Sequence, residues 1–349
     1  MGAPVARSPA TADSNSMAPR LRTVLAAVVL VCAVGVSAPG GPPPAWAAAP
    51  AHGETLFGMN VTSLSALDQA EAAVGVRPAI VGTFATWAGA PDFPRSFADA
   101  VNRRGATPLI SWEPWDAERG GADQPAYALP TIIAGEHDAL IDRWARQVRA
   151  YRRPVMLRFA PEMNGDWLPW STGVNGNRAG QYADAWRHVR ARFRRVGTGN
   201  AVWVWNPIAA YEGATPLRDL FPGRRDVDWL AVDGYNWGDV RAWGWQTYSD
   251  LFPATLRQLA ALAPRKPVMI AETASAPGPR KAAWVADTFR RARADGVDAL
   301  VWFEFEKEAD WRLAGDTPAA RTAAGELRRP GWRAGGDLTA VERAVNGRR

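Results

Sequence analysis

The sequence predicts a single-domain (β/α)8 TIM barrel, an α/β fold in which eight parallel strands alternate with helices. Three observations predict it. Eight short apolar runs recur along the chain, stretches with helical periodicity lie between them, and the connections after the runs are longer than those before them. A doubly wound sheet is the alternative. Such a sheet usually carries a glycine-rich phosphate turn after its first strand, and none follows the first run, residues 56–61.

Residues 1–47 read as a secretory signal peptide. A basic segment around Arg20 precedes the apolar run TVLAAVVLVCAVGV, and small residues follow at Ala45 and Ala47, after which we expect cleavage. The run has about 14 residues, fewer than the roughly 20 of a membrane-spanning helix, so we expect no stable membrane insertion. The protein is therefore predicted to be secreted, with residues 48–55 as a linker.

Residues 56–328 are predicted to form the barrel, and residues 329–349 a basic C-terminal tail in solvent. The formal charge of +6 is spread along the chain, whereas a nucleic-acid-binding protein shows a basic stripe. We therefore expect no nucleic-acid partner, and we expect a monomer. The single cysteine, Cys32, lies in the signal peptide, so the mature chain has neither disulfides nor thiol chemistry.

The eight apolar runs have the length and composition of buried parallel strands. The predicted strands are residues 56–61, 78–84, 107–112, 154–159, 201–206, 228–233, 267–272 and 299–305. Helical periodicity is clearest in residues 180–195, where an apolar residue recurs every three or four positions, at Tyr182, Trp186, Val189 and Phe193. The other helical stretches are residues 137–150, 250–262 and 281–294.

Loop lengths indicate which end of the barrel carries the function. The long connections all follow strands, and they are residues 113–135, 162–179, 206–220 and 234–249. Long loops inside a compact domain usually have a function, and the active sites of such barrels lie at the carboxyl ends of the strands.

Aromatic and polar residues gather at this end. Flat aromatic faces suit the apolar faces of sugar rings, and amide or carboxylate groups suit their hydroxyls. The candidate binding residues are Trp87, Glu113, Trp115, Arg158, Asn164, Trp167, Trp170, Asn206, Asp233, Tyr235, Trp237 and Trp302.

Two carboxylates at this end are placed to cleave a glycosidic bond, which needs one acid and one nucleophile or base. Glu162 follows the fourth strand and Glu272 ends the seventh. Strand spacing and tilt then place their carboxyl groups about 6 Å apart. This estimate lies between the spacings of retaining and inverting enzymes and leaves the stereochemistry open.

The surroundings suggest different roles for the two residues. Tyr235 and Arg158 are expected to donate hydrogen bonds that keep Glu272 ionised, as a nucleophile requires. Apolar neighbours should raise the pKa of Glu162 and favour its acid form. Glu113 and Asp233 are expected to bind substrate hydroxyls or to serve local structure.

The sequence lacks the residues that zinc enzymes and serine hydrolases need. The three histidines lie in a linker and in helical stretches, and the sequence has no HExxH or GxSxG motif. We expect neither a metal nor a cofactor. A barrel that binds polysaccharide without cleaving it is a further alternative, but a pure binder needs neither carboxylate.

The strand ends resemble glycoside hydrolase family 26, the secreted β-mannanase-like barrels of clan A. The resemblance runs over nearly all of residues 56–313. It is carried by SWEPW (111–115), RFAPEMNGDWLPW (158–170), DVDWLAVDGYNWG (226–238), KPVMIAETAS (266–275) and VWFEFEKEADWRL (301–313).

The resemblance implies a retaining endo-β-glycoside hydrolase with Glu162 as acid/base and Glu272 as nucleophile. It also implies that Tyr235 orients the nucleophile and that Trp302 forms the floor beneath the sugar at the cleaved bond. The implied substrate is β-mannan, with mixed-linkage β-glucan and β-1,3-xylan as alternatives. Mannanases of the family usually carry a histidine before the acid/base, where this chain has Pro161, which has no hydrogen-bond donor.

Overall fold

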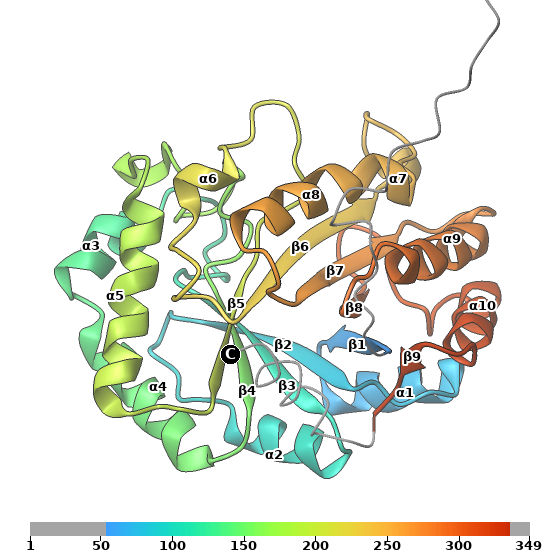
Figure 1. Cartoon of the computed structure of the whole chain (residues 1–349), viewed down its shortest axis with the longest axis horizontal. Helices are drawn as coiled ribbons and strands as arrows, with labels where there is room; N and C mark the ends of the chain where they lie inside the picture. Colours follow the sequence, from blue (N-terminus) through green and yellow to red (C-terminus); the bar gives the residue numbers. More distant parts are fainter. Residues whose placement is uncertain (1–53, 336–349) are drawn as a thin grey trace, which may run out of the picture. The chain divides into compact units, whose positions relative to one another are not determined.

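Eight parallel strands close into a barrel within residues 54–335, the part of the chain that the computed structural model describes (Figure 1). The barrel strands are β1 (Thr55–Val61), β2 (Ile80–Thr86), β3 (Thr107–Glu113), β4 (Val155–Phe159), β5 (Ala201–Trp205), β6 (Trp229–Asn236), β7 (Val268–Ser275) and β8 (Ala299–Glu304). Strands β2 to β8 pair in chain order, and β1 pairs with both β8 and β2. The predicted fold class is confirmed.

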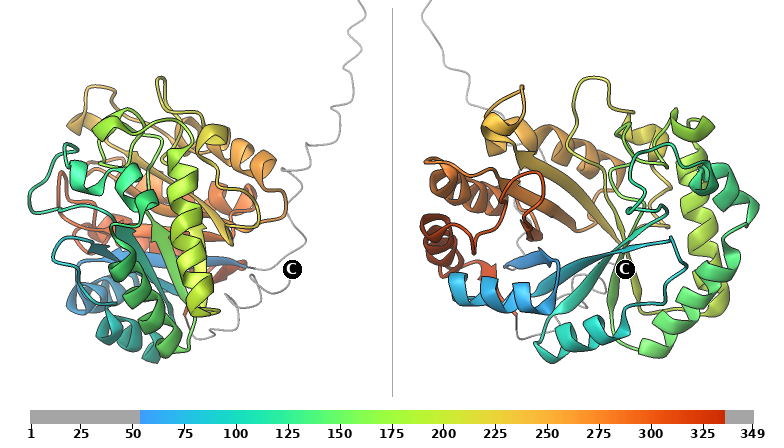
Figure 2. Two further views of the ribbon diagram at one scale, coloured as in Figure 1. Left: turned by 90° about the vertical axis from the view of Figure 1, so that its left-hand side faces the viewer. Right: turned by 180° about the vertical axis from the view of Figure 1, so that it is seen from behind.

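Every barrel strand is followed by at least one helix, and the helices surround the strands (Figure 1; Figure 2). The α-helices are α1 (Leu64–Val74), α2 (Arg95–Arg103), α3 (Leu129–Ala134), α4 (Asp138–Tyr151), α5 (Gln181–Val196), α6 (Leu217–Leu220), α7 (Tyr248–Leu251), α8 (Pro253–Leu262), α9 (Lys281–Ala294) and α10 (Thr317–Leu327). Three 3-10 turns lie in the loops: η1 (Pro125–Tyr127), η2 (Val174–Gly176) and η3 (Gly238–Val240).

Three predicted elements differ clearly from the structure. Strands β6 and β7 each extend three residues beyond their predicted ends, which carries Tyr235 and Ser275 into the sheet. The predicted helix 250–262 is two helices, α7 and α8. Pro253 begins the second one, because proline has no N–H and fits only the first turn of a helix.

Alternation along the strands divides the core into two layers. In β5, Val202 and Val204 belong to the cluster inside the barrel, whereas Trp203 and Trp205 belong to the larger cluster that includes the helices. The four apolar residues predicted for one face of α5 are all buried, and they pack in the same outer layer: Tyr182, Trp186, Val189 and Phe193. A side chain at a strand end therefore reaches the site only when its position is on the inner face.

Strands β1 and β2 approach closely at the inner face. A Cβ atom on Gly82 would lie 1.7 Å from Oδ1 of Asn60, so a larger residue at position 82 would displace the Asn60 side chain. Asn60 has no exposed surface. Its match to a glycosylation sequon, Asn60-Val61-Thr62, is therefore closed to modification in the folded protein.

A ninth strand corrects the predicted C-terminal boundary. Strand β9 (Trp332–Arg333) pairs with β1 at Thr55, and Trp332 is buried against Phe289 of α9. The barrel domain therefore continues past residue 328, and the linker ends before Thr55. Trp332 is the one tryptophan of residues 329–349, and its burial is what extends the domain.

The predicted signal peptide and the rest of the tail lie outside the described residues. Among residues 54–335, no helix combines the length and apolarity that crossing a membrane requires.

Candidate active site

The chain turns sharply after β4, where Glu162 lies. Ala160 and Glu162 have φ angles of 45° and 55°, which are uncommon for residues that carry a side chain. The Glu162 amide donates to the carbonyl of Asn206 at 2.7 Å, and the Tyr182 hydroxyl donates to the carbonyl of Ala160 at 3.0 Å. Contacts from β5 and α5 thus hold a strained turn in place, as is common at functional sites.

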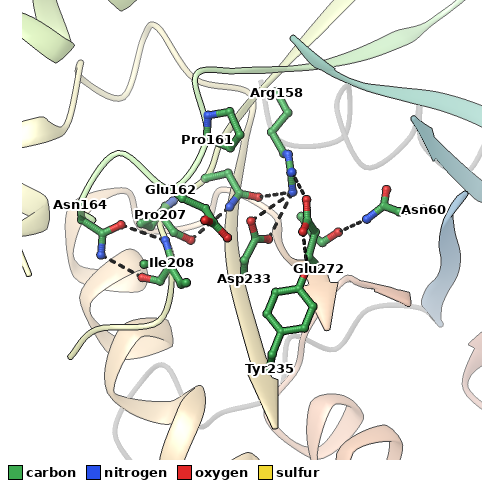
Figure 3. Close-up of polar contacts among 12 residues, drawn as sticks. Asn60, Arg158, Pro161, Glu162, Asn164, Pro207, Ile208, Asp233, Tyr235 and Glu272 are labelled. Carbon is green, nitrogen blue, oxygen red and sulfur yellow. Dashed lines mark hydrogen bonds and ion pairs between the residues drawn. The ribbon is translucent and has the colours of Figure 1, made fainter. Parts of the chain in front are cut away.

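Glu272 is aimed by a bulge in β7. The pairing between β6 and β7 shifts between Val232 and Asp233, which leaves Ala271 as an extra residue on β7. A bulge of this kind re-aims the side chain beside it. The Ala271 carbonyl accepts a hydrogen bond of 2.8 Å from Nδ2 of Asn60, which reaches it from β1 (Figure 3). The interrupted ladder is therefore satisfied by a side chain inside the barrel.

Two donors hold the carboxylate of Glu272, as the sequence predicts. Nη2 of Arg158 donates to Oε1, and the hydroxyl of Tyr235 donates to Oε2 (Figure 3). Nη1 of Arg158 also donates to both oxygens of Asp233 at 3.2 Å. Arg158 and Asp233 are 1% and 0% exposed. Because charge-assisted hydrogen bonds are strong and directional, this buried guanidinium fixes the positions of both carboxylates.

The carboxyl groups of Glu162 and Glu272 face each other at the mouth of the barrel (Figure 3). One oxygen from each, together with one from Asp233, lie within 4.8 Å of one another. The limit applies to one oxygen of each group, and it agrees with the close, facing pair expected from strand geometry. Three carboxylates at this spacing resemble a metal site, but Arg158 already bonds two of them.

Glu162 has the acidity of a general acid. Burial, and secondly the charge of Glu272, raise the pKa of Glu162 to about 7. Nε1 of Trp167 donates to Oε2 of Glu162 at 3.2 Å, which opposes the shift because it favours the ionised form. A carboxyl group with a pKa near 7 is about half protonated at neutral pH, and the protonated form can transfer its proton.

Glu113 is a fourth carboxyl group at the same rim. Burial raises the pKa of Glu113 to about 7, against the opposing charge of Arg158. Nε1 of Trp115 donates to Oε2 of Glu113 at 2.9 Å. Both residues are partly exposed, so their assignment as substrate contacts stays a prediction.

Four of the predicted binding residues contact the protein itself. Asn164 uses both ends of its amide on Ile208, accepting from its N–H at 2.9 Å and donating to its carbonyl at 3.0 Å. Asn206 accepts from Arg158 and donates to a carbonyl of its own chain segment. These two residues, with Arg158 and Asp233, are buried. We therefore assign the four as supports of the two glutamates instead of substrate contacts.

Three of the predicted tryptophans are buried in the outer layer. Trp87 is 2% exposed and packs against Trp112, and Trp170 is fully buried and donates to the carbonyl of Pro161. Trp302 is also fully buried, and its ring contacts Trp284 of α9. It lies on the helix side of β8, so it does not form the expected floor beneath the sugar. Sequence alone did not show the inner or outer face of these positions.

A Trp302→Phe variant tests this correction. Loss of ring volume and of the indole donor to the Trp311 carbonyl should lower the free energy of unfolding by about 1–3 kcal/mol. The KM for polysaccharide should not change. Urea denaturation and steady-state kinetics measure the two effects. A large rise in KM with unchanged stability would restore Trp302 to the sugar site.

The tryptophans that do reach the surface of the site are Trp115, Trp167 and Trp237, which are partly or largely exposed. Sequence reasoning missed four aromatic residues near them. Phe303 and Trp311 contact the ring of Tyr235, and Tyr211 and Trp243 are exposed in neighbouring loops. Phe303 lies in an almost continuously apolar run, where alternation does not reveal which residues face the inside of the barrel. The loop residues could not be predicted either, because nothing in the sequence fixes the path of a loop.

Comparison with known proteins finds several similar curated proteins. Endoglucanase H of Acetivibrio thermocellus is 36% identical over 261 residues, 72% of this chain and 27% of that protein. The beta-1,3-xylanase TXYA of a Vibrio species is 31% identical over 120 residues, 32% of this chain and 24% of that protein. The chain thus spans about a quarter of the length of these curated relatives.

Among solved structures, a GH26 beta-mannanase from Bacteroides ovatus matches with a TM-score of 0.62 and 17% identity. The match covers 82% of this chain and 92% of that chain. At this level of identity the likeness shows a shared fold and does not transfer a substrate.

The sequence profile described as glycosyl hydrolase family 26 matches residues 119–289. This range contains the carboxyl ends of β4 to β7 and therefore both facing glutamates. The profile, the endoglucanase relative and the shared barrel agree with the motifs at the strand ends. The chain belongs to glycoside hydrolase family 26.

Proposed function

We propose that this enzyme is a retaining, endo-acting β-glycan hydrolase with Glu162 as acid/base and Glu272 as nucleophile. The observation that carries the proposal is the separation of their oxygens, within 4.8 Å. Retaining glycosidases place the two carboxyl groups about 5–5.5 Å apart, whereas inverting ones leave roughly 6.5–9.5 Å for a water molecule.

The reaction follows from the geometry in two steps. Glu272 attacks the anomeric carbon while Glu162 gives its proton to the leaving oxygen, which breaks the glycosidic bond and forms a glycosyl ester. Glu162, now ionised, then takes a proton from a water molecule that attacks the same carbon and releases Glu272. Arg158 and Tyr235 hold the carboxylate of Glu272 in place before the attack.

The stereochemistry is tested by NMR of the first product. A retaining enzyme acting on a β-linked glycan releases the β-anomer before it equilibrates with the α-anomer. Early appearance of the α-anomer would instead require an inverting reaction with another carboxylate as base, and it would overturn this part of the proposal.

A Tyr235→Phe variant removes one of the two donors to Glu272 and leaves the ring contacts in place. We expect kcat to fall by roughly 10- to 100-fold, because one charge-assisted hydrogen bond to a buried carboxylate is worth about 1.5–3 kcal/mol. Steady-state assays measure the loss. A change confined to KM would show that Tyr235 binds substrate instead of orienting the nucleophile.

As substrate we propose a β-linked glucan. The relative with 36% identity over most of this chain is named an endoglucanase, and Pro161 lacks the donor of the histidine that the mannanases carry. β-Mannan, the first expectation from the sequence, and β-1,3-xylan are the other arms of the test. Release of reducing ends from mixed-linkage β-glucan, β-mannan and β-1,3-xylan decides among them, and faster cleavage of mannan would refute the glucan assignment.

We also propose that the enzyme is secreted as a monomer that acts on extracellular polysaccharide. The basic segment, apolar run and small residues before residue 48 support secretion. Expression of the full chain in a secreting host, followed by N-terminal sequencing of protein from the medium, should give a start at Ala48. Protein that stays with the cells at full length would refute it.

A further inference from the structure

Exposed aromatic side chains gather on the loops around the active site. The exposed large hydrophobic residues of the described chain are Trp167, Tyr211, Val240 and Trp243, which are 40%, 44%, 43% and 61% exposed. They lie in three successive loops, after β4, β5 and β6. A single exposed aliphatic residue such as Val240 is ordinary, whereas aromatic side chains gathered on neighbouring loops mark a candidate binding surface. These loops open at the end of the barrel that holds the two glutamates.

The loop after β6 is held at both ends by one buried side chain. Oδ1 of Asn236 accepts hydrogen bonds from the amides of Gly238 and Gln246, at 3.2 and 2.9 Å. The carbonyl of Gln246 accepts a bond of 2.8 Å from the indole of Trp284 in α9. The loop between residues 238 and 246 is therefore anchored to the barrel and can present a side chain in a defined place.

Trp243 lies in the tight turn at the tip of this loop. The amide of Gly244 donates to the carbonyl of Arg241 at 3.0 Å, and Gly244 has a φ angle of 75° that favours glycine. The turn thus leaves Trp243 as the most exposed of the large hydrophobic side chains.

A chain of ring contacts connects Trp243 with the nucleophile. The ring of Trp243 lies 6.2 Å from that of Trp237, which lies 6.1 Å from that of Tyr235, the donor to Glu272. Trp237 itself is only partly exposed, because the guanidinium of Arg241 lies 4.8 Å over its ring and Trp311 packs against it. Trp243 therefore offers a larger exposed aromatic surface than Trp237 on this side of the site.

We propose that Trp243 is an outer sugar-binding platform, which stacks on one ring of a β-glycan chain beyond the sugars at the cleaved bond. The ligand class rests on the proposed function. On the other side of the site, Trp167 and Tyr211 stand 6.0 Å apart beside Glu162. A chain that contacts both aromatic groups passes over the two glutamates, which is the arrangement an endo-acting enzyme requires.

Affinity electrophoresis measures this binding without catalysis. We would use the full chain with Glu272→Gln, in native gels that contain mixed-linkage β-glucan or β-mannan. Adding Trp243→Ala should weaken the retardation by about three- to tenfold, the scale of one aromatic stacking contact. Adding Trp243→Phe should recover most of it. Val240→Ala is the matched control, because it removes an exposed apolar group from the same loop without removing a flat ring, and it should leave retardation unchanged.

Kinetics provide the second measurement. In the active enzyme, Trp243→Ala should raise the KM for the polysaccharide by a similar factor and affect a short aryl glycoside less. Any of three results would overturn the platform. Retardation could be equal with and without Trp243, Val240→Ala could cause an equal loss, or the parent could show no retardation in either gel. The active enzyme could also cut neither polysaccharide while Trp243→Ala still abolishes retardation in the gels. That result would support the platform and refute the proposed function.

Discussion

Glu272→Ala is expected to lower kcat on polysaccharide by at least about 10³-fold, the scale of removing an essential nucleophile. The reason is structural as well as chemical. Arg158 and Tyr235 converge on this one carboxylate, and no other carboxyl group of the described residues receives both donors. Reducing-end release by equal amounts of folded protein measures the effect, with thermal unfolding to confirm that both proteins are folded.

Azide sharpens this experiment. In Glu272→Ala, the small anion can enter the space that the side chain leaves and attack an aryl glycoside with a good leaving group. We expect partial recovery of turnover and a glycosyl azide of inverted configuration. Glu306→Ala removes an exposed carboxylate from the loop after β8 and serves as the control, with turnover within about twofold of the parent. Near-normal turnover in Glu272→Ala would end its assignment as nucleophile.

The fold could be predicted because its signals are local and repeated. Each strand of the barrel is a short apolar run, and the face of α5 is a series of residues three or four positions apart. The ends of an element could not be predicted where tertiary contacts determine them. β9 forms because Trp332 is buried beside β1. No local sequence pattern predicts a strand of only two residues.

The positions of Glu162 and Glu272 could be predicted from the strand count, but the faces of the tryptophans could not. Residues 299–305 are almost continuously apolar, so alternation does not distinguish Trp302, on the helix side, from Phe303, on the inner side. The bulge in β7 adds a further ambiguity, since an extra residue changes the face of every position after it. Only the pairing of β7 with its neighbours reveals that Glu272 points inward.

The hydrogen bonds that hold the site in place could not be predicted from the sequence either, because they join residues far apart in the chain. Asn60 bonds the bulge 211 positions away, and Arg158 bonds Asp233 and Glu272 across three strands. Buried polar groups must find partners, but their types alone do not say which. Several residues expected to touch the sugar are thus buried, and they bond the protein around Glu162 and Glu272.

Glu162→Gln should produce a loss that depends on the leaving group. On polysaccharide, whose leaving oxygen needs a proton, we expect kcat/KM to fall by about 10²- to 10⁴-fold, the usual contribution of general acid catalysis. On an aryl glycoside with an acidic leaving group, the first step needs no proton, and the loss of kcat/KM should be small. Equal losses on both substrates would show that Glu162 serves binding or structure instead of proton transfer.

The pH dependence gives an independent check on the same residue. Glu162 acts as an acid only while protonated, and its pKa is raised to about 7, so kcat/KM on polysaccharide should decline as the pH rises through about 7. The indole of Trp167 favours the ionised form. Trp167→Phe removes that hydrogen bond, so the pKa of Glu162 should rise and the decline should move to higher pH, whatever the ring contributes to binding. A shift to lower pH, or a decline that persists in Glu162→Gln, would assign the titration to another group, of which Glu113 is the nearest candidate.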